Sequence, residues 1–432
     1  MFSVSCETKR TKIIVFSILA IFLLACVISS ICFEKELMLG SFEEFNNDDV
    51  KYLRSAKTLL ETGTLTYNYP DQPTVFIMPG IVLLATPFVA IFGMEGAVLP
   101  IRIFFALLQT FNLYVVFLTA RKVFNTKTAL ITLVLSFFYI ANMYVSTAIL
   151  TETPAYTCFL LVMYFVIWGT DKRQKRYFIA GGIAWGVSVM FRPTMLALPA
   201  VIFIYWLLKK VKFKNMVIYG LCALVPLICI MTPWVIRNYN TFNRFIPLTL
   251  SSGNPKLQGT FMWYSEKSTA ESMSAIDISD LNNIHYENKE MTENEVQDKI
   301  ANRVFVYNIK NNTAEYILWY TVGKTGANIG IPHVWHPLFT GSVIPSIAYH
   351  IILLIFFIAN IFWLKKKKRY TPEILFLIFT MVLFNCMHLP YYCFPRYMYP
   401  VMNFMIMIDA YVIGIWWDNR KNNKITTEET NV

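Results

Sequence analysis

Charged residues are scarce in this chain of 432 residues, since Asp, Glu, Lys and Arg together make up only 15% of it. A soluble domain of ordinary composition carries about 25% charged residues. Hydrophobic residues account for 56% of the chain, which implies that many apolar side chains face something other than a protein core. The composition therefore excludes an ordinary soluble protein and predicts a chain that lies in a lipid bilayer.

The motifs that usually bind metals and nucleotides are also missing. No Cys-x-x-Cys pair occurs, and the cysteines lie mostly inside or beside apolar segments, so we expect neither a disulfide framework nor a zinc site. No Gly-x-Gly-x-x-Gly sequence opens a βαβ unit and no phosphate loop is present, so no nucleotide-binding fold is indicated. No internal repeat is visible, which argues against a transporter built from inverted repeats.

Positive charge exceeds negative charge, and the formal net charge is +11. The Lys and Arg residues form short clusters between apolar segments, as is typical of cytoplasmic loops in membrane proteins. We therefore expect a lipid bilayer as partner and no nucleic acid. The clusters are Lys9 to Lys12, Arg121 to Lys127, Lys172 to Arg176, Lys209 to Lys214 and Lys365 to Arg369.

Apolar segments that suit a hydrocarbon layer of about 30 Å recur along the chain. The stretch from Tyr177 to Leu208 is too long for one helical crossing, so we interpret it as a hairpin that turns at Arg192-Pro193-Thr194. In all, the pattern predicts about ten spans. They are Ile13 to Phe33, Ile101 to Thr119, Ala129 to Ala148, Pro154 to Trp168, Tyr177 to Phe191, Met195 to Leu208, Met216 to Ile236, Val343 to Leu364, Ile374 to His388 and Met398 to Trp417.

The apolar segment from Val75 to Phe92 decides the orientation of the spans that follow it. If this segment crosses the bilayer, the later basic clusters lie outside; if it lies in the interface, all of them are cytoplasmic. The positive-inside rule favours the second arrangement. We therefore interpret Val75 to Phe92 as a juxtamembrane or re-entrant helix of the outer face. The first span is then a retained anchor rather than a signal peptide, and both termini are cytoplasmic.

These assignments predict an all-α polytopic membrane protein with juxtamembrane helices in its first outer loop and a small extracytoplasmic cap. Within the cap, apolar residues at helical spacing predict a helix from Glu293 to Lys310. The expected parts are an N-terminal transmembrane module (1–236, including the outer loop 34–100), an extracytoplasmic loop or cap (237–342), C-terminal transmembrane helices (343–417) and a cytoplasmic tail (418–432).

A short stretch from Asn46 to Leu60 follows the first span. Good N-cap residues at its start, and apolar residues at i, i+3 and i+4 spacing, predict a helix with one apolar face. Asp48 and Asp49 lie in its first turn, beside the membrane surface. One interpretation is that these acids only complement the positive end of the helix; the other is that they are catalytic.

The predicted topology gathers further polar residues at the outer ends of the spans. A carboxylate there can accept a proton from an acceptor hydroxyl as a general base, and Arg side chains can bind a phosphate bidentately. The mixture therefore suits transfer from an anionic lipid donor. The set consists of Tyr52, Glu152, Arg192, Arg237, Asn238, His388, Arg396 and Tyr397.

Several of these residues also have a purely structural interpretation. Glu152 can cap a helix, Arg192 can extend to the membrane interface, and Arg396 can anchor the chain there. His333 and His336 have a His-x-x-His spacing that can suit a metal ion, although no helical pattern or acid accompanies them. A divalent metal ion is therefore the only cofactor that the sequence suggests.

In their order, these motifs resemble those of the C-type membrane glycosyltransferases that use polyprenyl-phosphate sugars, specifically the protein-mannosyltransferase and aminoarabinose-transferase group. The resemblance extends over nearly the whole chain. It rests on Asp48-Asp49-x-x-Tyr52-x-x-x-Ala56, Thr151-Glu152-Thr153-Pro154, Arg192-Pro193-Thr194, Pro233-Trp234-Val235-Ile236-Arg237-Asn238-Tyr239 and Pro395-Arg396-Tyr397-Met398-Tyr399-Pro400.

This resemblance implies an inverting sugar transfer at the outer face of the cell membrane. The donor would be a polyprenyl-phosphate-linked sugar, and the acceptor an extracytoplasmic protein, lipid or cell-wall glycan. Some members of the group hold a divalent ion near the acids. At the matching positions, the resemblance implies Asp48, then Asp49, as the base, Glu152 as the acid of the second outer loop, and Arg192, Arg237 and Arg396 as ligands of the lipid phosphate.

Three other functions stay open on the sequence alone. A glycan polymerase or ligase of the outer face would also use outer arginines and lipid-linked donors, but it would transfer an oligosaccharide and would not need Asp48. A lipid-linked sugar transporter predicts acids and arginines near the bilayer midplane rather than at the outer ends. A purely structural membrane protein predicts that replacing Asp48 and Asp49 by Asn has no effect.

Overall fold

The computed structural model describes residues 4–5, 7–334 and 343–430, with side chains described up to Arg420. All regular secondary structure in these residues is helical, and they contain no strand. The expected all-α fold is therefore confirmed. The helices are α1 (Lys9–Cys32), α2 (Asp48–Thr62), α3 (Gly80–Gly96), α4 (Val98–Val123), α5 (Thr126–Phe138), α6 (Ile140–Thr147), α7 (Glu152–Lys172), α8 (Lys175–Phe191), α9 (Leu198–Leu208), α10 (Phe213–Phe242), α11 (Gly253–Thr260), α12 (Glu266–Ser274), α13 (Lys289–Asn311), α14 (Thr313–Leu318), α15 (Lys324–Ile329), α16 (Val343–Lys366), α17 (Pro372–His388) and α18 (Pro395–Thr430), with short 3₁₀ or π turns η1 (Pro193–Ala197), η2 (Met262–Tyr264), η3 (Ser279–Asn283) and η4 (Trp319–Gly323).

Among the described residues, six helices are long and apolar enough to cross a membrane: α1, α4, α7, α10, α16 and the Pro395–Arg420 part of α18. The pair α5 and α6 is a seventh candidate. All of them overlap predicted spans, but the predicted total of about ten is not confirmed. The other predicted crossings form α8, α9 and α17, which are shorter. α3 is also short and apolar, so its position across or along the bilayer stays a prediction.

The segment expected to form one span from Ala129 to Ala148 is broken into α5 and α6, which are bent by 59° relative to each other. The break lies at Tyr139, whose backbone is extended with φ −78° and ψ 95°. A break leaves carbonyl groups without helical partners. At the break, the Ser136 carbonyl accepts the Tyr139 backbone amide at 3.3 Å, and the buried side-chain amide of Asn142 also donates to it at 2.8 Å. This polar side chain therefore makes a break inside an apolar segment tolerable.

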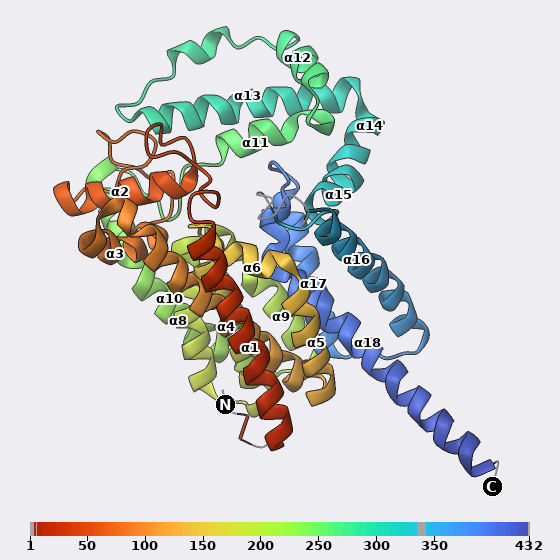
Figure 1. Ribbon diagram of the computed structural model, residues 1–432. Coiled ribbons are helices and arrows are strands. Elements are labelled where there is room, and N and C mark those ends of the chain that lie inside the picture. The colour runs from red at the N-terminus through yellow and green to blue at the C-terminus, as the bar shows by residue number, and fades with distance from the viewer. Residues whose placement is uncertain (1–3, 6, 335–342, 431–432) are drawn as a thin grey trace.

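One end of the helix bundle is covered by α11, α12 and α13, and α2 and α3 lie at the same end (Figure 1). The helix predicted from Glu293 to Lys310 is confirmed as α13, in which Ile300 and Val304 are buried in a small apolar cluster of the cover. Glu290 of α13 accepts hydrogen bonds from the Thr74 hydroxyl at 2.5 Å and the Asn68 amide at 2.9 Å. The cover is thus tied to the loop between α2 and α3.

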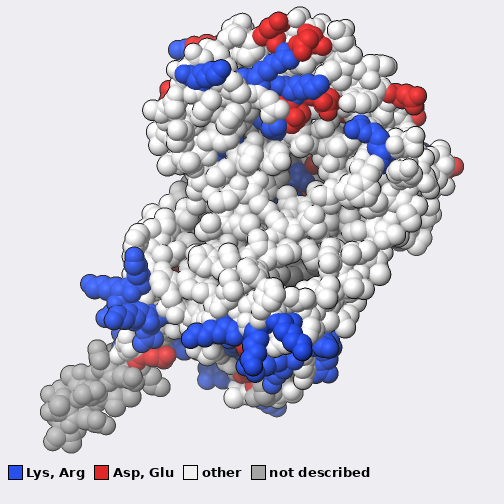
Figure 2. Space-filling view, turned by 180° about the vertical axis from the view of Figure 1, so that it is seen from behind, with Lys and Arg blue, Asp and Glu red and all other residues white. Residues whose placement is uncertain are grey.

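Charge divides the surface into three zones (Figure 2). Lys and Arg gather at the end opposite the cover, where α4, α7, α9 and α16 end and α5, α8 and α10 begin. A band with almost no charge follows, and the cover carries both signs. This pattern is the one expected of a membrane protein with a hydrocarbon belt and one strongly basic face.

Gly80, the first residue of α3, lies against the backbone at the end of α8. A Cβ atom at Gly80 would lie 2.5 Å from the carbonyl oxygen of Met190, two residues before Arg192. Gly80→Ala is therefore expected to push α3 away from this turn and to destabilise the protein by about 1–3 kcal/mol, measured as a lower midpoint of thermal unfolding. Gly96→Ala is the control, because a Cβ there makes only an ordinary contact at 3.5 Å. Equal stability of the two variants would contradict the prediction.

Candidate active site

The acidic stretch after the first span forms α2, as predicted. The side chain of Asn47 accepts a hydrogen bond from the Asp48 amide at 2.8 Å at its start, and Gly63 ends it in the left-handed conformation with φ 70°. Tyr52 and Leu53 are buried. This packing fixes the first turn of α2, and with it two adjacent carboxylates, against the end of the bundle.

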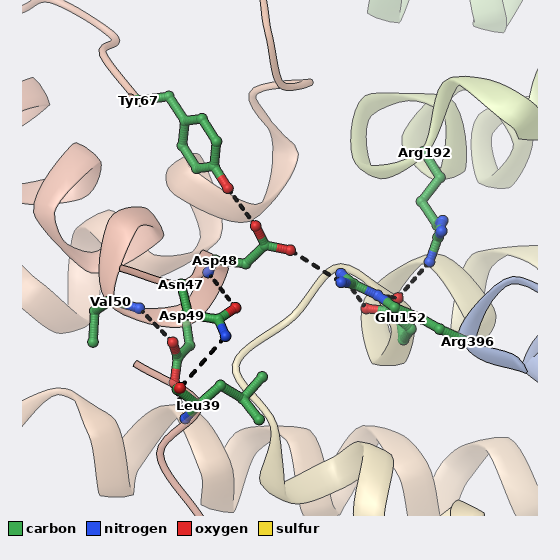
Figure 3. A network of polar contacts seen from close by, with 9 residues as sticks. All are labelled: Leu39, Asn47, Asp48, Asp49, Val50, Tyr67, Glu152, Arg192 and Arg396. Atoms are coloured by element: carbon green, nitrogen blue, oxygen red, sulfur yellow. Dashed lines mark hydrogen bonds and ion pairs between the residues drawn. The ribbon is translucent and has the colours of Figure 1, made fainter. Parts of the chain in front are cut away.

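The two carboxylates have different environments (Figure 3). Asp49 is 1% exposed, and its side chain accepts hydrogen bonds from the backbone amides of Leu39 at 2.8 Å and Val50 at 2.9 Å. Burial raises the pKa of the Asp49 carboxyl, although these two amides and the nearby Arg102 act in the opposite direction. Asp49 therefore points into the protein and holds the loop before α2.

Asp48 points the other way, into a pocket. One of its oxygens accepts a hydrogen bond from the Tyr67 hydroxyl at 2.5 Å, and the other lies 3.0 Å from Nη1 of Arg396. Its side chain keeps 33% of its exposure. Burial and the nearby Asp48 carboxylate raise the pKa of Tyr67, so that the phenol stays protonated and donates. Asp48 is thus held in place and remains accessible.

Glu152, the first residue of α7, is buried between two arginines. Its carboxylate accepts a hydrogen bond from Nη1 of Arg192 at 2.6 Å and from Nη2 of Arg396 at 3.2 Å, and Nε of Arg396 also contacts it. Arg396 therefore bridges Glu152 and Asp48 (Figure 3). Paired charges of this kind are stable in a buried site only when all partners are present.

Asp48 and the two arginines, but not Glu152, line an open pocket of about 220 Å³ below the cover. Asp48, Arg192 and Arg396 form its charged wall, and aromatic and apolar side chains form much of the rest. Two hydroxyl-bearing residues, Thr249 and Ser251, line it from the segment between α10 and α11. The pocket thus combines an acid, guanidinium groups and apolar surface, which suits an amphipathic anionic ligand. Its aromatic and apolar members include Tyr52, Tyr67, Phe76, Ile77, Met78, Phe191 and Tyr397.

Besides Asp49 and Glu152, three residues predicted for the site lie outside this pocket. Arg237 donates to the backbone carbonyls of Thr74 at 2.7 Å and Leu65 at 3.3 Å, so it holds the loop between α2 and α3. Asn238 is fully buried and donates to the carbonyl of Ile246 at 2.8 Å. The third, His388, lies behind the pocket wall.

The ring of His388 stacks on the ring of Tyr397, with 4.7 Å between centroids and 4° between planes. Nδ1 of His388 lies 2.7 Å from the carbonyl oxygen of Phe384. His388 therefore supports Tyr397, which does line the pocket.

Residues 71–236 match the family model for dolichyl-phosphate-mannose-protein mannosyltransferases. The resemblance to this glycosyltransferase family is confirmed. The matched segment contains Glu152 and Arg192, whereas Asp48 precedes it and Arg396 follows it. No curated protein matches the sequence.

The fold is similar to that of AglB, an oligosaccharyltransferase of Archaeoglobus fulgidus. Its complex with an inhibitory peptide and a dolichol-phosphate aligns with a TM-score of 0.56 and 15% identity over 98% of this chain and 52% of that chain. The apo form aligns with a TM-score of 0.54 and 16% identity over 98% and 53%. This chain therefore spans about half the length of AglB. ArnT from Cupriavidus metallidurans bound to undecaprenyl phosphate gives a TM-score of only 0.42, with 14% identity over 93% of this chain and 76% of that chain.

Several residues of this site and its surroundings were not predicted from the sequence. Tyr67 lies in a turn-rich patch with no pattern that marks it as a partner of Asp48. Thr249 and Ser251 lie in a polar segment without periodicity. Arg102 could have been identified from the sequence, because an arginine inside an apolar segment is a candidate for a specific role. In the structure it is fully buried and donates to the carbonyl of Glu34 at 2.7 Å.

The predicted metal pair is only partly within the described residues. His336 lies outside them; His333 is 2% exposed, and its ring meets that of Tyr144 edge to face at 5.5 Å between centroids. Burial lowers the pKa of His333 to about 3. The part of the chain that the structure describes contains no group of three His, Cys, Asp or Glu residues placed to hold a metal ion. Arg396 already bridges Asp48 and Glu152, so these acids do not fit a divalent ion as arranged, and no step is assigned to one.

Proposed function

We propose that this protein is an integral-membrane glycosyltransferase that moves a sugar from a polyprenyl-phosphate carrier to an extracytoplasmic acceptor with inversion. The observation that carries the proposal is the convergence of Asp48, Arg192 and Arg396 on one pocket that also has an apolar wall. The family match and the fold similarity support the same class of reaction. The acceptor is a hydroxyl-bearing protein, lipid or glycan.

In the proposed reaction, the carboxylate of Asp48 accepts the proton of the acceptor hydroxyl as that oxygen attacks the anomeric carbon of the sugar. The bond between this carbon and the phosphate oxygen breaks, and its electron pair leaves with the polyprenyl phosphate. Arg192, at the pocket wall, stabilises the charge on the departing phosphate. Arg396 and Tyr67 hold Asp48 in position. A single displacement of this kind inverts the anomeric configuration.

The proposed orientation follows from the charge distribution. The basic end opposite the cover faces the cytoplasm under the positive-inside rule, so the pocket opens to the outer face of the cell membrane. The apolar part of the pocket wall suits the first isoprene units of the carrier. Acceptors approach from the side of the cover, where Thr249 and Ser251 line the pocket.

The test is transfer of labelled sugar from a panel of polyprenyl-phosphate sugars to endogenous acceptors in membranes that contain the protein. The proposal predicts transfer from at least one monophosphate donor. Transfer only from diphosphate-linked oligosaccharides would instead favour the glycan polymerase or ligase. Movement of the lipid-linked sugar across the bilayer without transfer would favour the transporter.

Two of the three arginines that were expected to bind the donor phosphate, Arg192 and Arg237, can be distinguished by substitution. Arg192→Gln is expected to raise the KM for the donor about 10- to 100-fold, because one charge-assisted contact to the phosphate is lost. Arg237→Gln is expected to leave this KM unchanged and to lower thermal stability, because the hydrogen bonds of Arg237 to described residues go to two backbone carbonyls and to Asn238. Donor titrations at equal protein abundance measure both values. A larger KM effect for Arg237→Gln would contradict the assignment.

A further inference from the structure

Two adjoining cavities lie at the basic end of the bundle, far from the pocket of Asp48. The first, of about 370 Å³, is formed by the end of α7, the turn between α9 and α10, and the start of α10. Arg173, Lys209, Lys210 and Lys212 line it, with Asp171 as the only acid among its lining residues. Its surroundings are therefore positive on balance.

Most of this positive charge is not neutralised by the protein. Lys209 pairs with Asp171 at 2.9 Å and with Glu373 at 2.7 Å. By contrast, no ion pair joins Arg173, Lys210 or Lys212 to any other residue that the structure describes. Asp171 is already paired with Lys122 and Lys209, so three basic side chains around the cavity form no ion pair among the described residues and are suited to an anionic ligand.

The second cavity, of about 240 Å³, is an apolar groove between α7, α8, α9 and α10. Val166, Ile202 and Leu224 line it together with two glycines, Gly181 and Gly220, which leave it room. Leu224 is 38% exposed, and the neighbouring side chains of α8, α9 and α10 are exposed and apolar. The groove therefore faces the hydrocarbon belt rather than water.

Three aromatic rings join the two cavities. Tyr219 lines the basic cavity, while Phe178 and Trp206 line the groove. The rings of Phe178 and Tyr219 stack at 4.1 Å between centroids, and Trp206 meets Tyr219 at 6.1 Å. The indole of Trp206 also donates to the Thr170 hydroxyl at 3.1 Å. Such rings are typical of the level where water meets lipid, so the basic cavity lies at that level with the groove directly beneath it.

We propose that the two cavities form one binding site for an anionic phospholipid of the leaflet at the basic end. Its phosphate lies between Arg173, Lys210 and Lys212, and one acyl chain lies in the groove. A soluble anion would occupy only the basic cavity. A zwitterionic lipid carries no net charge, so it would not neutralise the positive charge of that cavity. The proposal is independent of the glycosyltransferase activity, because no residue of the site belongs to the pocket of Asp48.

The test measures binding of phosphatidylglycerol and phosphatidylcholine with identical acyl chains to the purified full-length protein, by native mass spectrometry. Phosphatidylglycerol is expected to bind more tightly. The double variant Lys210→Gln, Lys212→Gln should weaken its binding about fivefold for each charge removed. The control pair Lys175→Gln, Lys214→Gln removes the same charge from the same end outside the cavity and should have little effect. Equal losses in the two pairs would overturn the proposal, since binding would then depend only on overall charge.

The groove is tested separately at Gly220. A Cβ atom at Gly220 would meet no atom within 4 Å, so a side chain can begin there without a clash, and Gly220→Leu is expected to extend into the groove. It is expected to weaken phosphatidylglycerol binding at least fivefold, whereas Gly220→Ala should retain most of it. Wild-type affinity in Gly220→Leu would overturn the placement of the acyl chain. Displacement of the lipid by millimolar inorganic phosphate would show a site for soluble anions and would overturn the lipid assignment.

Discussion

Asp48→Asn is expected to reduce sugar transfer by about 10²- to 10⁴-fold, the usual contribution of a general base. The substitution is nearly isosteric, and the amide oxygen can still accept a hydrogen bond from Tyr67 or Arg396. The variant should therefore fold and bind the donor while it loses the group that accepts the proton. Transfer and donor binding at equal membrane abundance measure the two effects separately.

Asp49→Asn provides the matched control, because it makes the same chemical change at the adjacent residue. The Asp49 carboxylate accepts two backbone hydrogen bonds in a buried position, and an amide cannot accept both as well. The expected cost is about 1–3 kcal/mol of stability, with transfer per folded molecule close to wild type. Loss of transfer in Asp49→Asn with full activity in Asp48→Asn would reverse the assignment of the base. Full activity in both would return the two acids to a role in capping α2.

Arg396→Gln is expected to be the most destabilising substitution in the site, at about 3–5 kcal/mol. Among the described residues, it leaves the buried carboxylate of Glu152 with Arg192 as its remaining ion-pair partner, and it removes the ion pair of Asp48. The midpoint of unfolding in detergent measures the effect. Adding Glu152→Gln to this variant should recover part of the loss, because it removes the buried carboxylate that has lost one of its two arginine partners.

Arg303→Gln is the control for this experiment. Arg303 also binds a carboxylate with both ends of its guanidinium, at 2.7 Å to each oxygen of Asp280. That pair is exposed on the cover, so the expected cost is only about 0–1 kcal/mol. If Arg396→Gln costs no more than Arg303→Gln, or if Glu152→Gln recovers nothing, the buried network does not hold the site together.

The sequence predicted α2 well, because its caps and its apolar spacing are local signals. The spacing of apolar residues in the sequence also distinguishes the two acids. Asp49 precedes Tyr52, Leu53 and Ala56 by three, four and seven positions, so it shares the buried face of the helix, and all four residues are buried. Asp48 lies beside this face and reaches the pocket.

The residues of the network around the acids were predicted from the sequence, but the contacts between them were not. Arg396 contacts Asp48 across 348 positions of the chain and Glu152 across 244. No spacing rule reaches such distances, and the motif order of the resembling family supplied the grouping instead. The same limit explains why the role predicted for Arg237 differs from its contacts. Its motif grouped it with the phosphate ligands, whereas its guanidinium donates to backbone carbonyls.

The predicted spans agree with the helices wherever a long apolar segment stands alone. α8 and α9, on either side of Arg192, are short helices, and hydropathy does not determine how deep in the bilayer the turn between them lies. The bend at Tyr139 depends on a side-chain amide that replaces a helical hydrogen bond. The mean hydropathy of an apolar segment does not detect a single hydrogen bond of this kind.

The most direct test of the central claim uses purified protein, a polyprenyl-phosphate sugar labelled in the sugar, and a membrane extract as acceptor. Transferred sugar and released polyprenyl monophosphate are measured in the same reaction, together with the anomeric configuration of the product. The account predicts equal amounts of both products and an inverted configuration. Release of polyprenyl diphosphate from an oligosaccharide donor, with no monophosphate released from any sugar donor, would contradict it.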